Sequence, residues 1–260
     1  MWYNSIIKRR EHFIMNDHLN RTGLLDYDNE NIQHLILEKK WDKLPPYECI
    51  RIIYTFVRDE ILFGYNTDDA IPASRVLRDG YGQCNTKGIL FMALLRACGI
   101  PCRMHGFTID KALQKGAVTG LIYALAPNDI VHSWVEVCLE GVWYELEAFI
   151  IDKAYLDSLK RYTGICEGAF CGYGVAVSDM SRVQTDFDRN NTYIQSEGIN
   201  NDLGVFDDPD MFFAAHSQPL SPLKKFIFSH LARHLMNRNV KRIRNRTAQH
   251  IGAYKRRRGQ

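Results

Sequence analysis

The most constraining feature of the sequence is a pair of strand-like segments joined by Glu140-Gly141. From Val131 to Leu139 the residues alternate between two sides, as in a β-strand with one buried face. A second strand-like segment runs from Val142 to Phe149. Two residues between such segments fit a tight hairpin turn, which places Leu139 opposite Val142 and fixes the other pairs by counting. The sequence therefore predicts an antiparallel hairpin with a defined register.

This register gathers acidic side chains on the side of the hairpin that carries His132. His132 is expected to face Phe149, and Glu136 is expected to face Glu145. Glu147 is then the diagonal neighbour of His132, about 7 Å away and within reach of a long side chain. Glu145 lies one pair further along the strand. We therefore predict that Glu147 is the residue that orients the imidazole of His132.

A candidate nucleophile, Cys84, stands where a glycine-rich turn meets the start of a predicted helix. Gly80 and Gly82 flank Tyr81 in this turn, and the helix is expected to run from Cys84 to Cys98. The N-terminus of a helix carries partial positive charge that stabilises a thiolate, which is the nucleophilic form of cysteine. Most cysteines are small buried apolar residues without catalytic function, so the position alone does not decide the matter.

Together, Cys84, His132 and Glu147 provide the three parts of an activated nucleophile. Such a site needs a thiol, a base within hydrogen-bond reach and a third group that holds the base. It attacks a carbonyl carbon, forms a thioester and passes the acyl group to water or to an amine. We therefore predict these three residues to be catalytic.

Other residues are candidates for binding the substrate and its tetrahedral intermediate. An oxyanion needs hydrogen-bond donors, and the backbone N–H of Cys84 at the helix start is one candidate. Gln83 or Tyr81 is a candidate for the second donor, and the sequence does not choose between them. Trp134 shares its strand face with the histidine and is a further candidate for substrate binding.

The remaining pattern predicts an α+β fold, because several helices precede a run of antiparallel strands. Residues 150–220 are rich in Gly, Asp and Asn, and no element is assigned to them before Ser221-Pro222, a helix-start signal. The expected helices are 4–19, 29–41, a helix from Pro46 to about 61, 73–77 and 84–98, and the expected strands are 102–109, 130–139 and 142–149.

Three ordered motifs make the chain resemble the transglutaminase-like superfamily, as a small bacterial-type member. Residues 47–65 resemble the helix that precedes the family's core, and residues 73–103, with Gly82-x-Cys84, resemble its nucleophile segment. The run from His132 to Val137, followed by Gly141-x-Trp143 and an acid four residues later, resembles the second half of the core. The resemblance covers roughly residues 46–150.

The resemblance implies a papain-like core, in which the nucleophile heads a helix that packs on an antiparallel sheet. It implies that Cys84 is the nucleophile, His132 the general base and acid, and Glu147 the orienting acid. The family usually has Asp where this chain has Glu147, and Asn85 is also unusual for the residue after the nucleophile.

The function expected is cysteine-dependent acyl transfer from an amide, which is a peptide, protein or small amide or a glutamine-type carboxamide. Protease, deamidase and transamidase activities remain open, and the acyl acceptor is water or an amine. The alternative is a catalytically silent transglutaminase-like module that binds a partner. A third hypothesis is an anionic-ligand binder in which the C-terminal tail is the functional part.

Charge is distributed unevenly along the chain, which suggests two parts. Residues 211–260 hold twelve Lys or Arg and no Asp or Glu, so residues 1–210 hold 21 basic and 30 acidic residues. We expect a catalytic domain at 1–220, with its core at 46–150, and a basic helical extension at 221–260. Nucleic acid or an anionic membrane is a conceivable partner of the extension, but docking on the acidic body is favoured.

The extension is expected to dock through an apolar helix face rather than through its charge. The helix is expected at 221–238, and residues beyond about 240 are expected to be less well ordered. The residues expected to pack on the catalytic domain are Leu223, Phe226, Ile227, Leu231 and Leu235.

The cysteine count and the start of the sequence favour the cytoplasm. Seven cysteines is an odd number, and residues 1–19 lack the apolar stretch of a signal peptide. Cysteine pairs 98/102 and 166/171 are spaced more widely than the usual zinc-binding pair. We therefore expect reduced thiols, no metal and no cofactor.

Overall fold

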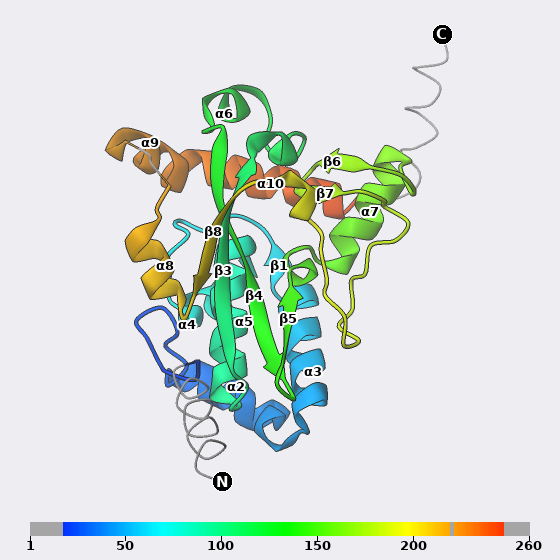
Figure 1. Ribbon diagram of the computed structural model, residues 1–260. Coiled ribbons are helices and arrows are strands. Elements are labelled where there is room, and N and C mark those ends of the chain that lie inside the picture. The colour runs from blue at the N-terminus through cyan, green and yellow to red at the C-terminus, as the bar shows by residue number, and fades with distance from the viewer. Residues whose placement is uncertain (1–17, 219–220, 247–260) are drawn as a thin grey trace.

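The computed structural model describes residues 18–218 and 221–246, which form an α+β fold around a four-stranded antiparallel sheet (Figure 1). The strand order in this sheet is β5-β4-β3-β8, and helix α5 lies along one face of it. The α+β class expected from the sequence is confirmed. The helix expected at 4–19 lies outside the described residues. Within the described ranges no helix combines the length and the apolar character needed to span a bilayer.

The elements follow one another from helices to strands and back to helices. The strands are β1 (Leu62–Phe63), β2 (Tyr81–Gly82), β3 (Cys102–Asp110), β4 (Asp129–Leu139), β5 (Val142–Leu146), β6 (Phe170–Gly172), β7 (Val175–Val177) and β8 (Ile199–Phe206). The helices are α2 (Glu30–Lys39), α3 (Pro46–Asp59), α4 (Ala73–Asp79), α5 (Cys84–Ala97), α6 (Gly120–Leu125), α7 (Lys153–Thr163), α8 (Pro209–Ala215), α9 (Pro222–Ile227) and α10 (Arg233–Arg244).

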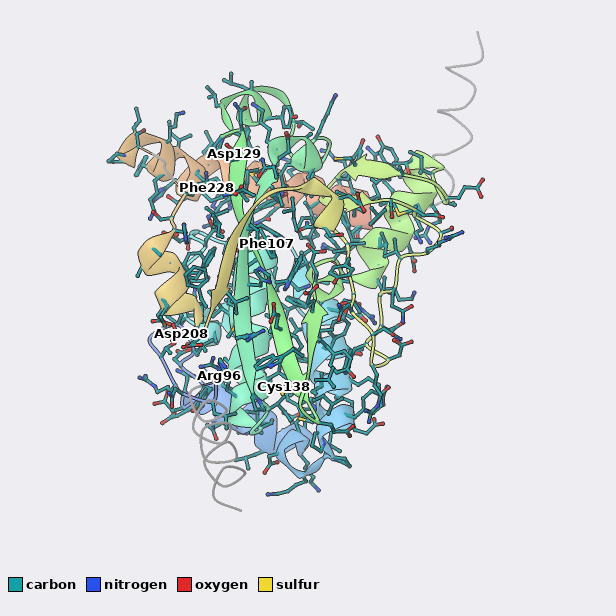
Figure 2. The ribbon with its side chains drawn as sticks, viewed as in Figure 1. Arg96, Phe107, Asp129, Cys138, Asp208 and Phe228 are labelled. Atoms are coloured by element: carbon teal, nitrogen blue, oxygen red, sulfur yellow. The ribbon has the colours of Figure 1, made fainter. Side chains whose placement is uncertain are left out.

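Helix α5 is the centre of the molecule, and every residue from 84 to 96 is buried. Its burial is not confined to one stripe, because α3, α4 and the sheet surround this helix on several sides. Even Lys87 is fully buried, and its Nζ donates to the carbonyl oxygens of Arg58 (3.1 Å) and Ile150 (2.9 Å). Arg96, labelled in Figure 2, lies in the last turn of the helix and donates to the carbonyl of Cys102 at 2.8 Å. Helix α5 is therefore fixed at both ends.

The hairpin has the predicted register. Glu140 and Gly141 both have positive φ, 54° and 83°, as a two-residue turn of type I′ requires. Leu139 pairs with Val142, and Glu136 pairs with Glu145, as counting from the turn predicts. The pairing stops at Leu146, however, so the second strand is shorter than the expected segment that runs to Phe149.

The early end of β5 overturns one detail of the expected hairpin. Glu147 leaves the extended conformation, with ψ at −34°, and a 3₁₀ turn follows from Ala148 to Ile150. Phe149 therefore does not face His132. Its ring lies in the core instead, 4.9 Å from the ring of Phe91 and 6.1 Å from that of Tyr54.

The segment without an assignment, residues 150–218, contains α7, β6, β7, β8 and α8. Strand β8 pairs with β3 and completes the sheet, with Gly106 opposite Gly204. Gly106 is needed there because a Cβ would stand 2.2 Å from the ring of Phe212 on α8. Register shifts between Gly106 and Phe107 and between Thr108 and Ile109 interrupt this pairing. Because of these irregularities, the alternation of apolar and polar residues in the sequence did not predict β8.

The C-terminal helix packs on the domain, but through a different face from the one expected. The five apolar residues expected to be buried are all exposed, from 45% for Ile227 to 68% for Leu223. A π-helical turn, Phe228–Ala232, separates α9 from α10, and α10 packs on α7 and extends to Arg244. The buried residues are Ala232, Met236, Val240 and Ile243. Helix α10 thus continues past residue 240, beyond which less order was expected, and residues 247–260 lie outside the described residues.

Polar side chains also join α10 to the chain around β1. Asn237 accepts from the backbone N–H of Tyr65 at 2.7 Å and donates to its carbonyl at 3.0 Å. Two residues earlier, the N–H of Phe63 donates to Asp152 at 2.9 Å, and its carbonyl accepts from Arg244 at 2.7 Å. Three side chains therefore satisfy the outer edge of this strand.

Candidate active site

Cys84 is the first residue of α5, at the end of the turn that the two glycines bracket. The helix begins with reciprocal hydrogen bonds between Gln83 and Thr86, in the manner of a capping box. This arrangement leaves the Cys84 side chain at the positive end of the helix, where a thiolate is favoured. The residue is 8% exposed.

His132 comes from β4, one of the two inner strands of the sheet, and is fully buried. Its Nε2 lies 2.8 Å from Oε1 of Glu147. The other ring nitrogen, Nδ1, has no hydrogen-bond partner among the described residues. Cys84 lies close enough to the ring to raise the pKa of His132. The structure therefore brings the three predicted catalytic residues together, with His132 in the middle.

These neighbours change the acidity of His132. Burial opposes its charged form, but the charge and hydrogen bonding of Cys84, together with the hydrogen bond and charge of Glu147, outweigh that effect and raise the pKa of His132 to about 10. An imidazolium is the form that this environment stabilises at neutral pH.

Glu147 is itself held by backbone groups. Its Oε2 accepts from the N–H of Ile194 at 2.7 Å and from the N–H of Gln195 at 2.8 Å. Its own N–H donates to the carbonyl of Thr192 at 2.8 Å. Residues 192–195 lie in the segment 150–220, to which the sequence analysis assigned no element. The sequence therefore did not predict these hydrogen bonds to Glu147. The longer Glu side chain, in place of the Asp usual in the resembling family, reaches both His132 and this segment.

Asn85, which the sequence marked as unusual, fastens the nucleophile helix to the histidine strand. Its Nδ2 donates to the carbonyl of Val131 at 3.1 Å, and its Oδ1 accepts from the hydroxyl of Ser133 at 2.9 Å. Val131 and Ser133 flank His132 in the chain. Asn85 therefore fixes the position of His132 relative to Cys84, although it does not touch the imidazole by a hydrogen bond.

Two of the predicted substrate-binding residues have structural contacts of their own. The Gln83 side chain accepts from the N–H of Asn66 at 2.9 Å and donates to Asp69 at 2.9 Å. The Tyr81 hydroxyl lies 3.3 Å from Nη1 of Arg233 on α10. Both side chains tie neighbouring segments to the turn that precedes Cys84. Their part in oxyanion binding stays a prediction.

Trp134 lies on the same face of β4 as His132 and is 6% exposed. Its ring packs at 4.1 Å from that of Phe107, which is labelled in Figure 2, and at 5.3 Å from that of His105. Tyr193 approaches it from the other side at 5.6 Å. The indole therefore forms the wall beside His132, and its role in substrate binding stays a prediction.

Tyr65 belongs beside the nucleophile, and sequence reasoning missed it. Burial and the charge of the neighbouring Cys84 raise its pKa. Its hydroxyl hydrogen-bonds to Oε1 of Gln114 at 2.5 Å, and its backbone is held by Asn237. Tyr65 comes shortly after β1 in the chain, and the residues around it form no pattern that predicts a place beside Cys84.

Metal-ligating residues gather at one place among the described residues, and it is not a cysteine site. His105, Glu136 and Glu145 each offer a ligand atom, and these atoms lie within 4.8 Å of one another. Cys98 is partly exposed, whereas Cys102 is buried and its sulfur lies 3.6 Å from the carbonyl of Met92.

The chain was compared with protein families, curated proteins and solved structures. Residues 37–148 match the family described as the transglutaminase-like superfamily, and no curated protein matches significantly. A crystal structure of a proposed cysteine protease from Cytophaga hutchinsonii is 15% identical and aligns with a TM-score of 0.43. The alignment covers 75% of this chain and 48% of that chain, so this chain spans about half the length of that protein.

The family match spans the elements that carry the site. It includes α3, the glycine turn, α5, β3 and the hairpin through Ala148. Cys84, His132 and Glu147 all lie within it. Residues 37–148 are therefore similar to the core of the transglutaminase-like superfamily.

Proposed function

We propose that this protein is a cysteine-dependent acyl-transfer enzyme that cleaves or exchanges an amide through a thioester on Cys84. The observation that carries the proposal is the chain of contacts from Cys84 through His132 to the backbone-anchored Glu147. The similarity of residues 37–148 to the transglutaminase-like superfamily supports a cysteine enzyme. The acyl donor that fits this chemistry is a peptide bond or a glutamine-type carboxamide.

The reaction begins with the thiolate and the imidazolium as a pair. The thiolate of Cys84 attacks the carbonyl carbon of the amide, and negative charge develops on the carbonyl oxygen. Backbone N–H groups at the start of α5 are the donors suited to that oxyanion. His132 then gives its proton to the leaving nitrogen, the C–N bond breaks, and ammonia or an amine departs from the thioester.

The second half of the reaction returns the enzyme to its starting state. The neutral imidazole of His132 accepts a proton from water or from an amine as either attacks the thioester carbonyl. The C–S bond breaks, and the thiolate and imidazolium are restored. Glu147 keeps the imidazole oriented through both proton transfers and stabilises its charged form.

The experiment that tests this proposal is detection of the acyl-enzyme. The full chain is incubated with a set of peptide esters, peptides and glutamine-containing peptides, and the intact protein and its peptides are examined by mass spectrometry. We expect a substrate-dependent mass increase on Cys84 and release of amine or ammonia, both absent in Cys84→Ala. Cys166→Ala and Cys171→Ala, which remove exposed thiols, are matched controls and should behave like the parent chain.

The near-complete burial of Cys84 and His132 favours a second candidate function, a catalytically silent module that binds a partner. The two functions differ in the reactivity of the thiol. A silent module leaves Cys84 unmodified by every acyl donor and by iodoacetamide at neutral pH. Labelling of Cys84 that depends on His132 contradicts the silent module and supports the enzyme.

A further inference from the structure

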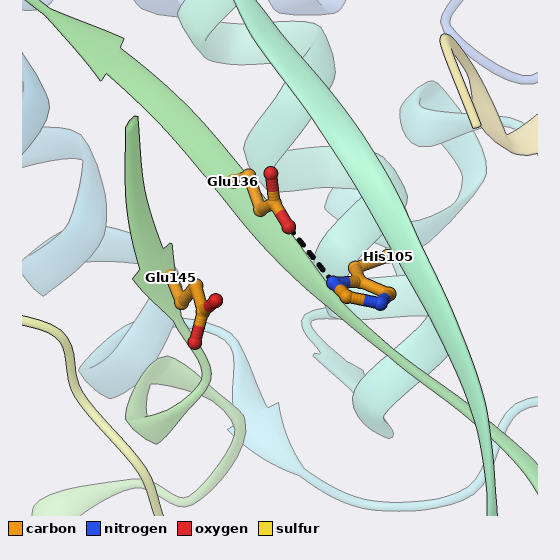
Figure 3. Close-up of side chains that lie close together, drawn as sticks. All are labelled: His105, Glu136 and Glu145. Atoms are coloured by element: carbon orange, nitrogen blue, oxygen red, sulfur yellow. Dashed lines mark hydrogen bonds and ion pairs between the residues drawn. The ribbon is translucent and has the colours of Figure 1, made fainter. Parts of the chain in front are cut away.

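A compact group of metal-ligating side chains lies on the sheet face that carries His132, outside the catalytic triad. His105 comes from β3, Glu136 from β4 and Glu145 from β5, so three adjacent strands contribute one residue each (Figure 3). Their ligand atoms lie within 4.8 Å of one another. Nδ1 of His105 is 2.8 Å from Oε1 of Glu136. None of the three takes part in the proposed acyl transfer.

Each of the three side chains has a second polar atom held by another residue. Nε2 of His105 lies 3.0 Å from Oδ1 of Asp202 on β8. Nε of Arg103 donates to Oε2 of Glu136 at 2.6 Å, and the hydroxyl of Tyr193 donates to Oε2 of Glu145. The remaining atoms, Nδ1 of His105 and Oε1 of Glu136, contact each other at 2.8 Å, and the ligand atoms of all three residues lie within 4.8 Å of one another.

This arrangement has the form of a metal site with its supporting shell. A histidine that ligates a metal commonly donates its other ring N–H to a carboxylate, which fixes the tautomer and the ring orientation. Asp202 stands in that position for His105. Ligating carboxylates are likewise held by hydrogen bonds at their second oxygen, as Arg103 and Tyr193 do here.

The charge and the surroundings of the group also suit a cation. Three carboxylates (Glu136, Glu145 and Asp202) and one guanidinium (Arg103) surround His105, so the group carries a net negative charge whether or not the imidazole is protonated. Trp134 Nε1 is buried and has no hydrogen-bond partner among the described residues. Its ring lies between those of His105 and Tyr193, 5.3 Å and 5.6 Å away. A water molecule bound to a cation at this point would give that N–H an acceptor.

We propose that His105, Glu136 and Glu145 bind one divalent transition-metal ion of the Zn²⁺ or Mn²⁺ type, with Asp202 holding the histidine. One imidazole nitrogen and two carboxylate oxygens favour such ions over Mg²⁺ and Ca²⁺, which prefer oxygen ligands throughout. Three protein ligands leave coordination positions for water. The ion would join β3, β4 and β5 beside the Trp134 wall of the catalytic site.

The test is isothermal titration calorimetry on the full chain after treatment with a chelator. A Cys84→Ala background is used, so that the triad thiol cannot bind the ion. We expect binding of Zn²⁺ and Mn²⁺ at one ion per chain, and much weaker binding of Mg²⁺ and Ca²⁺. Co²⁺ identifies the ligands by absorption, since thiolates give an intense near-ultraviolet charge-transfer band and nitrogen and oxygen ligands do not.

Variants connect the binding to these residues. Glu145→Gln and His105→Gln should each weaken Zn²⁺ binding at least tenfold, and Asp202→Asn should weaken it by about 10–100-fold. Glu140→Gln, in the turn of the same hairpin and paired with Arg189, is the matched control and should bind like the parent. Glu145 is partly exposed, so Glu145→Gln is expected to fold. It therefore still tests metal binding if His105→Gln does not fold.

Two results would overturn the proposal. One is the absence of binding by Zn²⁺, Mn²⁺ and Co²⁺. The other is binding that is unchanged in Glu145→Gln and His105→Gln or that shows the thiolate band with Co²⁺. The hydrogen bonds and ion pairs among the side chains around His105 would then only stabilise the sheet. Because binding is measured without catalysis, the result is independent of the acyl-transfer proposal.

Discussion

Glu147 joins His132 to a distant segment of the chain through its two carboxylate oxygens. Oε1 contacts Nε2 of His132 at 2.8 Å, and Oε2 accepts from the N–H groups of Ile194 and Gln195. Glu147 is fully buried, so these contacts replace all of its hydration. The orientation of the imidazole therefore depends on how residues 192–195 are placed as well as on the hairpin.

Shortening or neutralising Glu147 should impair the site. Glu147→Asp withdraws the carboxylate by one methylene and cannot keep both sets of contacts, and Glu147→Gln removes the charge that stabilises the imidazolium. We expect the rate of Cys84 acylation to fall by about 10²-fold or more in each. Single-turnover acylation with circular dichroism as a folding check measures this, and Glu140→Gln is the control. Parent-like rates in both variants would exclude an orienting role for Glu147.

The pH dependence of Cys84 labelling should report the thiolate–imidazolium pair. The raised pKa of His132, about 10, lies above its ordinary value near 6.5, so the stabilisation from its charge is complete below pH 6.5 and is lost as the pH rises through about 10. We expect iodoacetamide to label Cys84 at a substantial rate below pH 7. In His132→Ala the rate should fall and should rise with pH only near the usual thiol value of about 8.5. Identical curves for both chains would disprove the pairing.

Adjacent residues of α10 should differ sharply in their effect on stability. Met236 is 7% exposed, whereas Leu235 is 48% exposed. Met236→Ala should lower the free energy of unfolding by about 2–5 kcal/mol through loss of burial and a residual cavity. Leu235→Ala should stay within about 0.5 kcal/mol of the parent. Thermal unfolding of the two variants measures the difference, and equal melting temperatures would show that α10 does not pack through this face.

Truncation tests the same face at its far end. A chain that ends after Asn239 loses Val240, Ile243 and the contacts of Arg244 with Asp152 and Phe63. Compared with a chain that ends after Arg246, its melting temperature should fall by several degrees, since two buried aliphatic side chains contribute about 1.5–3 kcal/mol each. Differential scanning calorimetry compares the two. Equal stability would mean that these contacts are not populated in solution.

Buried Lys87 should give stability a distinct pH dependence. Desolvation by burial lowers its pKa to about 7, against the opposing charges of Asp152 and Asp59. The unfolded chain then holds this proton between about pH 7 and 10.5 when the folded chain has lost it, so the free energy of unfolding should rise with pH in that window. The slope should be at most about 1.4 kcal/mol per pH unit. Lys87→Met should remove this part of the slope in urea unfolding measured from pH 7 to 9.5. Parallel slopes in parent and variant would contradict the lowered pKa.

The positions of the candidate catalytic residues were predictable because local rules determine them. Glu140-Gly141 allowed the hairpin register to be counted, and the register placed Glu147 diagonal to His132. The glycines around Tyr81 and the helix pattern after them located Cys84. Each inference used only residues within about twenty positions of one another, where turn and strand geometry give definite answers.

What the sequence did not reveal depends on contacts between distant segments. The N–H groups of Ile194 and Gln195 bind Glu147 from a loop that has no periodic pattern. Strand β8 has register shifts that break its alternation. The C-terminal helical segment has apolar residues on two different faces. Only packing against the rest of the protein selects the face that contains Met236 and Val240. Propensity could locate that helix but could not choose its buried face.

The side chains along β1 have a consequence for how the protein matures. Asp152, Arg244 and Asn237 occupy the outer hydrogen-bonding groups of Phe63 and Tyr65, as a neighbouring strand would. An open strand edge can recruit another polypeptide and start aggregation. During synthesis this edge emerges from the ribosome long before residues 237 and 244 do, so a nascent chain carries it uncovered until α10 has been made. The C-terminal helix thus closes a surface on which unfinished copies of the chain could otherwise associate.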